Sequence, residues 1–135
     1  MNIDEKKKIA LSLIDTFNNA SRVSLELREI GLTKEIKSDN TPVSNGDIEV
    51  NKILTNKIQA ITPNISIISE ESNNHKLDSN LKNFWLIDPI DGTRDYINNR
   101  DEFTLNAALI LDKKPVIGII AAPAKKKDFL FLWIV

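Results

Sequence analysis

The sequence predicts an α/β domain. Two long segments carry apolar residues at helical spacing, several short runs are rich in β-branched residues, and two longer apolar runs are joined by a turn. The 135 residues are enough for one domain with a shared apolar core. We therefore expect a single domain that contains both helices and strands.

The composition excludes several classes of function. A formal net charge of −1 gives no electrostatic reason to expect nucleic acid or an anionic membrane surface as a partner. The absence of cysteine rules out disulfides, zinc thiolate sites and thiol nucleophiles, and it fits a reducing compartment, so the expected location is the cytoplasm. No apolar run approaches the roughly 18 to 20 residues that a membrane span requires. We expect neither a nucleic acid nor a membrane partner.

The first part of the chain predicts two helices separated by a loop. Residues 4–28 place apolar side chains on one helical face, and Gly31 is a plausible stop. The segment 35–47, EIKSDNTPVSNGD, has the composition of a loop. A second helix is expected to begin at Asp47, where an acid stabilises a helix start, and to close at Pro63.

The rest of the chain predicts strands. ISIIS (65–69) and FWLI (84–87) are short buried strands, and each is followed by carboxylates. The runs 103–111 and 115–122 are separated by DKK and predict a hairpin of two long strands. The final run, FLFLWIV (129–135), has no turn, cap or polar tail, so we expect it to add an exposed edge or an uncovered face through which chains associate, giving a homo-oligomer.

The stretch DPIDGT, residues 88–93, has the features of a metal and anion site. Carboxylates that alternate with exposed backbone at a chain turn are suited to hard divalent cations. Pro89 favours an extended Asp88, so that a following turn can bring Asp91 back toward the same point. Gly92 permits a tight turn, and Thr93 opens a short helix whose N–H groups can hold a phosphate. Metal and anion are therefore expected at one place.

Three ordered motifs carry a resemblance to a known family: TPVSNGD (41–47), SEES (69–72) and WLIDPIDGT (85–93). They resemble those of the lithium-sensitive, magnesium-dependent phosphatases of the inositol monophosphatase superfamily. Residues 94–123 are similar to the bacterial 3′(2′),5′-bisphosphate nucleotidase branch, in which a charged pair, an aromatic residue and E-F-T-x-N follow the DGT. The resemblance implies the layered α/β sandwich of these phosphatases, Mg²⁺ as cofactor and a small phosphorylated metabolite as substrate.

The resemblance covers only the N-terminal half of a family member. We therefore expect residues 1–127 to be the N-terminal part of a phosphatase domain, truncated relative to the family, and residues 128–135 to be an apolar tail outside it. Family members carry a further metal ligand in a W-D motif, whereas Trp133 is followed by isoleucine and valine. A catalytically inactive remnant with weak metal and phosphate binding is therefore an alternative to an active bisphosphate nucleotidase, and inositol monophosphatase activity is another.

The resemblance also implies the metal ligands. Glu70 would share a water near the first magnesium ion, and Asp88 would bridge two ions. The carbonyl oxygen of Ile90 would complete one coordination sphere, and Asp91 would bind the second ion. Glu71 is as well explained as a solvated strand end as by a ligand role.

Substrate-binding and catalytic roles follow from the same resemblance. Gly92 and Thr93 would offer backbone N–H groups to the phosphate, and Glu70 would also face the substrate. Thr93 Oγ1, hydrogen-bonded to Asp47, would orient and deprotonate the attacking water. Lys37 would reach the substrate or a water near the metal, with a solvent-exposed lysine as the equal alternative.

Several residues near the motifs are assigned no direct role. Trp85 is expected in the core, and His75 in solvent. Arg94, Asp95 and Tyr96 are expected in the helix behind the phosphate loop. Family members usually carry alanine where this chain has Gly46, and glycine before a helix is expected to loosen the placement of the next residue, Asp47.

Overall fold

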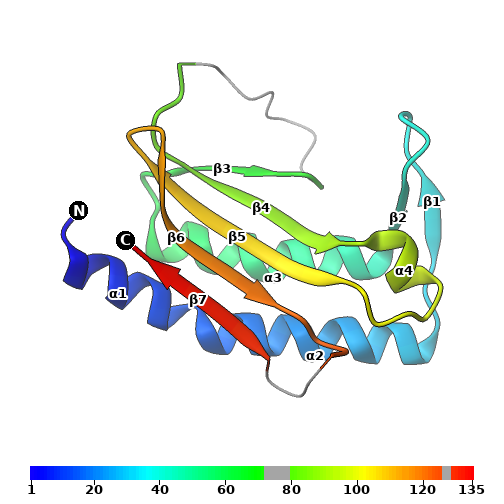
Figure 1. The fold of residues 1–135 in the computed structure, drawn as a ribbon. Helices are drawn as coiled ribbons and strands as arrows, with labels where there is room; N and C mark the ends of the chain where they lie inside the picture. The colour runs from blue at the N-terminus through cyan, green and yellow to red at the C-terminus, as the bar shows by residue number, and fades with distance from the viewer. Residues whose placement is uncertain (72–79, 126–128) are drawn as a thin grey trace.

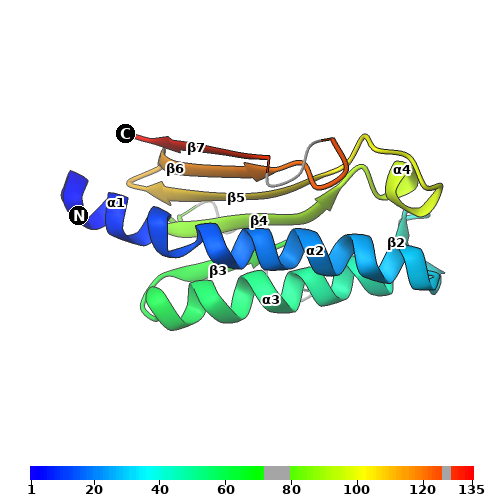
Figure 2. The ribbon, with the colours of Figure 1, turned by 90° about the horizontal axis from the view of Figure 1, so that it is seen from below.

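A five-stranded sheet and a layer of helices on one of its faces make up the computed structural model, which describes residues 1–71, 80–125 and 129–135. Figures 1 and 2 show the helices packed on one side of the sheet and no helix on the other. The predicted α/β class is confirmed. His75 and the expected boundary after residue 127 lie outside the described residues.

The sheet has the strand order β3-β4-β5-β6-β7. Strands β3 and β4 are parallel, and every other neighbouring pair is antiparallel. The strands are β3 (Ser66–Ser69), β4 (Phe84–Asp91), β5 (Thr104–Leu111), β6 (Lys114–Ala121) and β7 (Leu130–Ile134). Because parallel strands end at the same edge, the segments that follow β3 and β4 lie side by side.

The predicted hairpin is confirmed. Strands β5 and β6 are joined by Asp112 and Lys113, with φ of 50° and 63°, so the turn has two central residues instead of the three expected. Positive φ at both central residues is typical of the tightest hairpin turns. The final apolar run forms β7, the strand at one edge of the sheet.

The prediction of one continuous first helix is wrong, because the chain breaks at Leu13 between α1 (Ile3–Ser12) and α2 (Ile14–Ile30). Ser12 Oγ donates to the carbonyl of Ile9 at 2.6 Å, and Leu13 N–H donates to the carbonyl of Ala10 at 3.1 Å. Such side-chain bonds to the preceding turn bend helices. After the break α2 packs on α3 (Asn45–Ile61), the second predicted helix, which begins two residues before Asp47.

The predicted loop at 35–47 is also wrong in part. Strands β1 (Lys34–Ile36) and β2 (Pro42–Ser44) pair there as a short antiparallel hairpin. Its turn is closed by Asp39, whose carboxylate accepts bonds from the N–H and the hydroxyl of Thr41 at 3.0 and 2.5 Å. The polar composition that indicated a loop is the composition of this turn.

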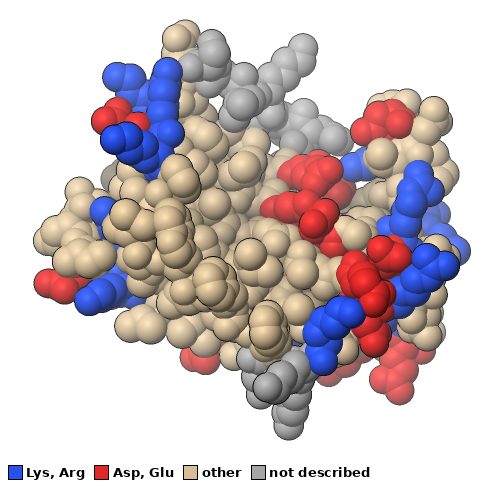
Figure 3. Space-filling model, viewed as in Figure 1, with Lys and Arg blue, Asp and Glu red and all other residues tan. Residues whose placement is uncertain are grey.

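Alternate residues of the strands face different surroundings, as strand geometry requires. Residues facing the helices are buried, among them Trp85, whose Nε1–H donates to Thr62 Oγ1 at 3.0 Å, so its predicted core position is confirmed. Residues on the other face, which we call the open face, are exposed and apolar: Leu86, Ile120, Phe131 and Trp133. Figure 3 shows this face as a broad uncharged area. No helix in the described part of the chain is both long and apolar enough to cross a membrane.

Candidate functional site

The parallel pairing of β3 and β4 brings two acidic segments together. Ser69 pairs with Ile87, and Glu70 N–H continues the ladder by donating to the carbonyl of Ile87 at 3.1 Å. Glu70 therefore lies beside Asp88. Acidic side chains gather at the end of the open face nearest β2 and α4 (Thr93–Ile97) in Figure 3, viewed as in Figure 1.

Asp88 is the least satisfied carboxylate of this group. Among the described residues its Oδ1 is buried and has no hydrogen-bond partner. Burial, the charge and hydrogen bond of Glu70, and the charges of Asp91 and Glu71 together raise the pKa of Asp88 to about 7, with burial as the largest cause. At neutral pH the Asp88 carboxylate is therefore stabilised by binding a proton or a cation.

Asp91 and Gly92 follow without the turn expected after Pro89. Strand β4 instead runs on to Asp91, which pairs with Thr104 after an irregularity in the register. The chain then turns at Gly92, with φ of 86°. A Cβ atom there would lie 2.5 Å from the carbonyl oxygen of Glu102, so only glycine fits. The predicted short helix, α4, begins at the next residue.

Asp47 is held by hydrogen bonds on both oxygens. Its Oδ2 accepts from the N–H and the hydroxyl of Ser44 at 2.8 and 2.5 Å, and its Oδ1 accepts from Thr93 Oγ1 at 2.8 Å. Ser44 caps α3, with Asp47 as the reciprocal partner. The same Thr93 hydroxyl lies 3.2 Å from the carbonyl oxygen of Ile90. The expected pairing of Asp47 with Thr93 is present.

The expectation that Gly46 loosens Asp47 is wrong. Gly46 is buried in the first turn of α3, and Asp47 is fully buried. The role of Ser44 was not anticipated, although the spacing of a serine three residues before an acid is a sequence signature of this cap.

Lys37 and Glu71 form an ion pair with 3.7 Å between Nζ and Oε1. The Glu71 side chain is only 8% exposed, so it is not a solvated strand end. Burial raises the pKa of Glu71, the Lys37 ammonium opposes this, and the charges of Asp47 and Glu70 raise it further. The charges of Asp47 and of Glu70 therefore both act on the Glu71 carboxylate. Lys37 joins the β1–β2 turn to the acidic end of β3.

The structure brings the acids to one end of the sheet without fixing a ligand set. Within the described ranges, no three acidic or histidine side chains are arranged to hold one ion. Glu70, Asp91 and Glu71 are close enough to affect the pKa of Asp88. The Thr93 hydroxyl lies within hydrogen-bond distance of both Asp47 Oδ1 and the carbonyl oxygen of Ile90.

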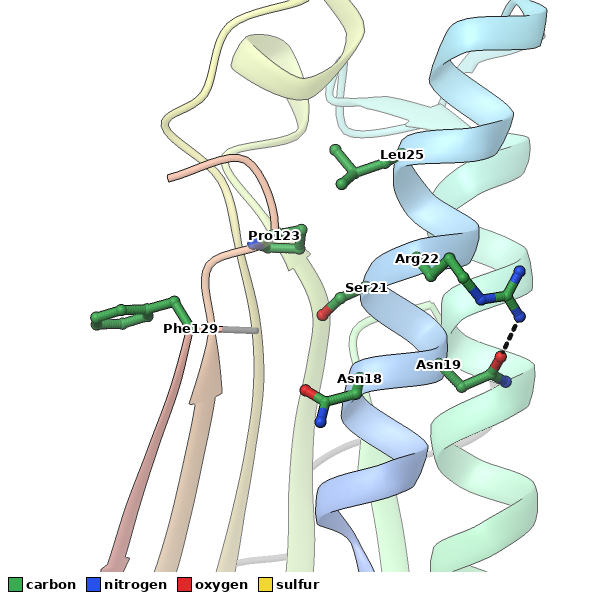
Figure 4. Close-up of a pocket in the computed structure, with 7 residues that line it drawn as sticks. All are labelled: Asn18, Asn19, Ser21, Arg22, Leu25, Pro123 and Phe129. Atoms are coloured by element: carbon green, nitrogen blue, oxygen red, sulfur yellow. Dashed lines mark hydrogen bonds between the residues drawn. The ribbon is translucent and has the colours of Figure 1, made fainter. Parts of the chain in front are cut away.

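A cavity of about 450 Å³ lies elsewhere, between α2 and the segments around Pro123 and Phe129 (Figure 4). The one cation among its described lining residues, Arg22, is engaged by Asn19 and Glu26 at 2.6 and 2.7 Å. The other described lining residues include Asn18, Ser21 and apolar Leu25. No acid is among the lining residues that the structure describes, so they do not supply the carboxylates that a Mg²⁺ site would need.

Comparison with protein families decides the relationship. The sequence profile of the Inositol monophosphatase family matches residues 4–133, nearly the whole chain. The chain belongs to the inositol monophosphatase family. The match includes the three motifs and strand β7 up to Trp133.

Several curated relatives are 3′(2′),5′-bisphosphate nucleotidases. The chain is 43% identical over 91 residues to the 3′(2′),5′-bisphosphate nucleotidase CysQ of Haemophilus influenzae, which covers 66% of this chain and 34% of that protein. Identity to CysQ of Escherichia coli K12 is 36% over 88 residues, or 64% and 36% of the two chains. The chain spans about a third of the length of these relatives.

Solved structures share the fold over nearly the whole chain. The extragenic suppressor protein SuhB of Bartonella henselae superposes with a TM-score of 0.79 at 25% identity, over 94% of this chain and 48% of that one. An IMPase/NADP phosphatase complexed with Mg²⁺ and phosphate superposes with a TM-score of 0.78 at 18% identity, over 98% and 48%. The layered fold of the family is therefore confirmed for about half of such a protein.

Proposed function

We propose that this chain carries the metal and phosphate site of a Mg²⁺-dependent phosphomonoesterase that acts on a small phosphorylated metabolite. The observation that carries the proposal is Asp88: a buried carboxylate with an unpartnered oxygen, beside Glu70 and near Asp91. Several acids placed together where one is buried need a compensating positive charge.

The donor set fits a hard divalent cation. Carboxylates and backbone carbonyls are the oxygen ligands that Mg²⁺ takes in proteins, and the chain has no cysteine thiolate to offer to a softer metal. We assign Glu70, Asp88, Asp91 and the carbonyl of Ile90 as the ligands. When bound, the cation supplies Lewis-acid stabilisation of phosphate charge and makes water more acidic.

Asp47 and Thr93 handle the proton of the attacking water in this proposal. The Thr93 hydroxyl donates to Asp47 Oδ1 at 2.8 Å, so its lone pairs are free to accept a hydrogen bond from a water. Transfer of the water proton to Thr93 Oγ1, with transfer of the Thr93 proton to Asp47, leaves the water oxygen able to attack phosphorus. We assign the backbone N–H groups of Gly92 and Thr93 to the phosphate, as the resemblance implies.

Glu70 and Lys37 are the remaining substrate-side assignments. Glu70 faces the same sheet end as Asp88 and is assigned to both metal and substrate. The Lys37 ammonium lies 3.7 Å from the Glu71 carboxylate. In a complex with substrate, the ammonium would therefore interact with both Glu71 and the substrate.

We favour 3′-phosphoadenosine 5′-phosphate as the substrate, with AMP and phosphate as products. The support is the 43% identity to bisphosphate nucleotidases over 91 and 94 residues. An inositol monophosphate is the second candidate, because a solved relative with this fold was bound with D-inositol-1-phosphate. An inactive remnant that binds metal is the third candidate.

The test measures phosphate release by the purified 135-residue protein from the bisphosphate nucleotide and from inositol 1-phosphate, with and without Mg²⁺ and Li⁺. We expect Mg²⁺-dependent, Li⁺-inhibited release from the nucleotide, abolished in Asp91→Asn. Release without Mg²⁺, or equal release by Asp91→Asn, would contradict the assignment. Mg²⁺ binding with no release from either substrate would identify the remnant.

We also propose a cytoplasmic location and self-association through the open face. The support for association is the exposure of Phe131 and Trp133 on β7, at 54% and 40%, beside exposed Ile120. Apolar edge strands of this kind pair with further chains. Sedimentation velocity should show concentration-dependent oligomers for the native chain and fewer for Phe131→Ser/Trp133→Ser. A monomer at all concentrations would contradict this.

A further inference from the structure

Three helices meet at the side chain of Tyr96, behind the Asp47–Thr93 pair. Tyr96 lies in α4, is fully buried, and donates its hydroxyl to the carbonyl of Ser24 in α2 at 2.7 Å. Its ring lies 4.8 Å from that of Phe103. The guanidinium of Arg28, also in α2, lies 5.7 Å from the Tyr96 ring centre. Tyr96 therefore ties α4 to α2.

The space for the Tyr96 ring exists because residue 46 has no side chain. A Cβ atom on Gly46 would lie 2.6 and 2.7 Å from Cε2 and Cζ of Tyr96, and closer still to its hydroxyl oxygen. Real Cβ atoms do not approach other atoms so closely, and a buried ring held at its far end cannot swing away. Gly46 and Tyr96 are thus complementary in size.

This contact lies directly behind the reacting pair. Gly46 immediately precedes Asp47, and Tyr96 lies one helical turn after Thr93, with Tyr96 N–H bonded to the carbonyl of Gly92 at 2.9 Å. A shift of the Tyr96 ring away from α3 would carry the start of α4 with it. It would then lengthen the 2.8 Å bond between Thr93 Oγ1 and Asp47 Oδ1.

We propose that Gly46 and Tyr96 are a matched pair of positioning residues that sets the distance between Thr93 and Asp47. The inference rests on the proposed function for its catalytic consequence, but the packing it describes is independent of activity. Substitution at either position acts on water activation through Thr93, without touching substrate or metal.

The first test is the melting temperature of Gly46→Ala. Overpacking of a filled core predicts a loss of about 5 to 10 °C. Helix propensity alone predicts the opposite sign, because alanine stabilises an unstrained helix relative to glycine. The matched control is Gly118→Ala, where the new Cβ would lie 3.6 Å from Trp133 Cε3, an ordinary contact. An unchanged or raised melting temperature for Gly46→Ala would overturn the proposal.

The second test asks for rescue by Tyr96→Phe. Without its hydroxyl, the ring can slide toward Ser24 and make room for a Cβ, so the two substitutions together should lose less than the sum of the single losses. Should Gly46→Ala not fold alone, recovery of a folded protein by the double variant is the expected result. Additive losses of melting temperature, or a double variant that still fails to fold, would overturn the proposal that Gly46 and Tyr96 are matched in size.

The third test separates positioning from plain packing. In a Thr93→Val background the hydroxyl bond to Asp47 is absent, so Gly46→Ala should lower the melting temperature by about half as much as in the native background. Equal losses in both backgrounds would show packing alone and overturn the positioning role. If the native chain releases phosphate, Gly46→Ala should lower kcat at least tenfold with KM changed less than twofold. A native chain without phosphate release would contradict the proposed function, while the stability tests would still decide the pair.

Discussion

Asp47 is buried and Asp88 is part-buried, and both lie at the same end of the fold. Their carboxylate oxygens differ in the hydrogen-bond partners that the chain provides. Asp47 accepts three hydrogen bonds from Ser44 and Thr93, all within the chain. Asp88 has an oxygen without a partner among the described residues and a pKa raised to about 7. We call the first group, with Ser44 and Thr93, the Asp47 side, and the second, with Glu70 and Asp91, the Asp88 side.

The difference separates structure from function within one site. The Asp47 side stabilises the fold by itself, because each charged hydrogen bond replaces one to water and caps a helix. The Asp88 side opposes folding at neutral pH, because it gathers like charges and buries one of them. A bound cation would stabilise the fold most at this group of acids, because it would offset the repulsion between their charges.

The largest expected effect is on the Asp47 side. Asp47→Ala should lower the free energy of unfolding by about 2 to 4 kcal/mol, because it removes a cap and leaves buried donors unpaired. Chemical denaturation in chelator measures it. Asp39→Ala is the control: this exposed carboxylate also accepts two bonds, from Thr41, and its removal should cost less than about 1 kcal/mol. Equal losses of unfolding free energy in Asp47→Ala and Asp39→Ala would contradict the structural role of the buried Asp47 carboxylate.

Substitution on the Asp88 side should have the opposite sign. At pH 8 in chelator, Asp88→Asn should raise the free energy of unfolding by an amount on the order of 1 kcal/mol, because it deletes one of several repelling charges. Asp91→Asn should raise it by less, since Asp91 is exposed. Thermal melts of the three proteins make the comparison. A clear destabilisation by Asp88→Asn would mean that this carboxylate is satisfied in the fold.

The stability of the metal-free protein should depend on pH through Asp88. Its folded pKa of about 7 lies above the model-compound value of 3.8, so between these values the native state binds the proton and the unfolded state does not. The contribution of Asp88 to stability is therefore largest at low pH and falls as pH rises from about 4 to about 7. Melting temperatures measured in chelator across this range should fall in the native chain and fall less in Asp88→Asn. Identical profiles would contradict the assignment to Asp88.

A smaller destabilisation than that of Asp47→Ala is expected where the two sides meet, at Lys37 and Glu71. Lys37→Met leaves the buried Glu71 without its cation and should cost about 1 kcal/mol. Adding Glu71→Gln should recover most of the loss, because no buried charge then remains. Urea denaturation of the single and double variants tests this, and a double variant less stable than Lys37→Met would mean that Glu71 has another partner.

The sequence predicted which helices and strands form better than it predicted the residues at which they begin and end. Strands β3 to β6 and the helix after Asp47 follow from periodicity, which reports burial directly. The break at Leu13 was missed because it depends on a bond from Ser12 to a backbone carbonyl, which leaves the apolar spacing intact. The composition of 35–47 predicts a loop instead of the β1–β2 hairpin because each strand has only three paired residues and the turn between them is polar.

The site was predictable where motifs fixed both residue and partner. The bond between Thr93 and Asp47 joins residues 46 apart in sequence, and only the resemblance to a family indicated it. The fit of Tyr96 over Gly46 could not be predicted, because no local pattern relates positions on two different helices. The pairing of Lys37 with Glu71 likewise depends on where a turn and a strand end meet in space.

The central claim is that the Asp88 side binds a divalent cation. Isothermal titration of MgCl₂ into the native chain, Asp88→Asn and Asp112→Asn tests it most directly. Asp112 lies in the β5–β6 turn with φ of 50°, which asparagine accepts, so this control makes the same chemical change away from the acids. We predict saturable binding by the native chain and Asp112→Asn and at least a tenfold loss of affinity in Asp88→Asn. Equal affinity in all three proteins, or no binding by the native chain, would contradict the account.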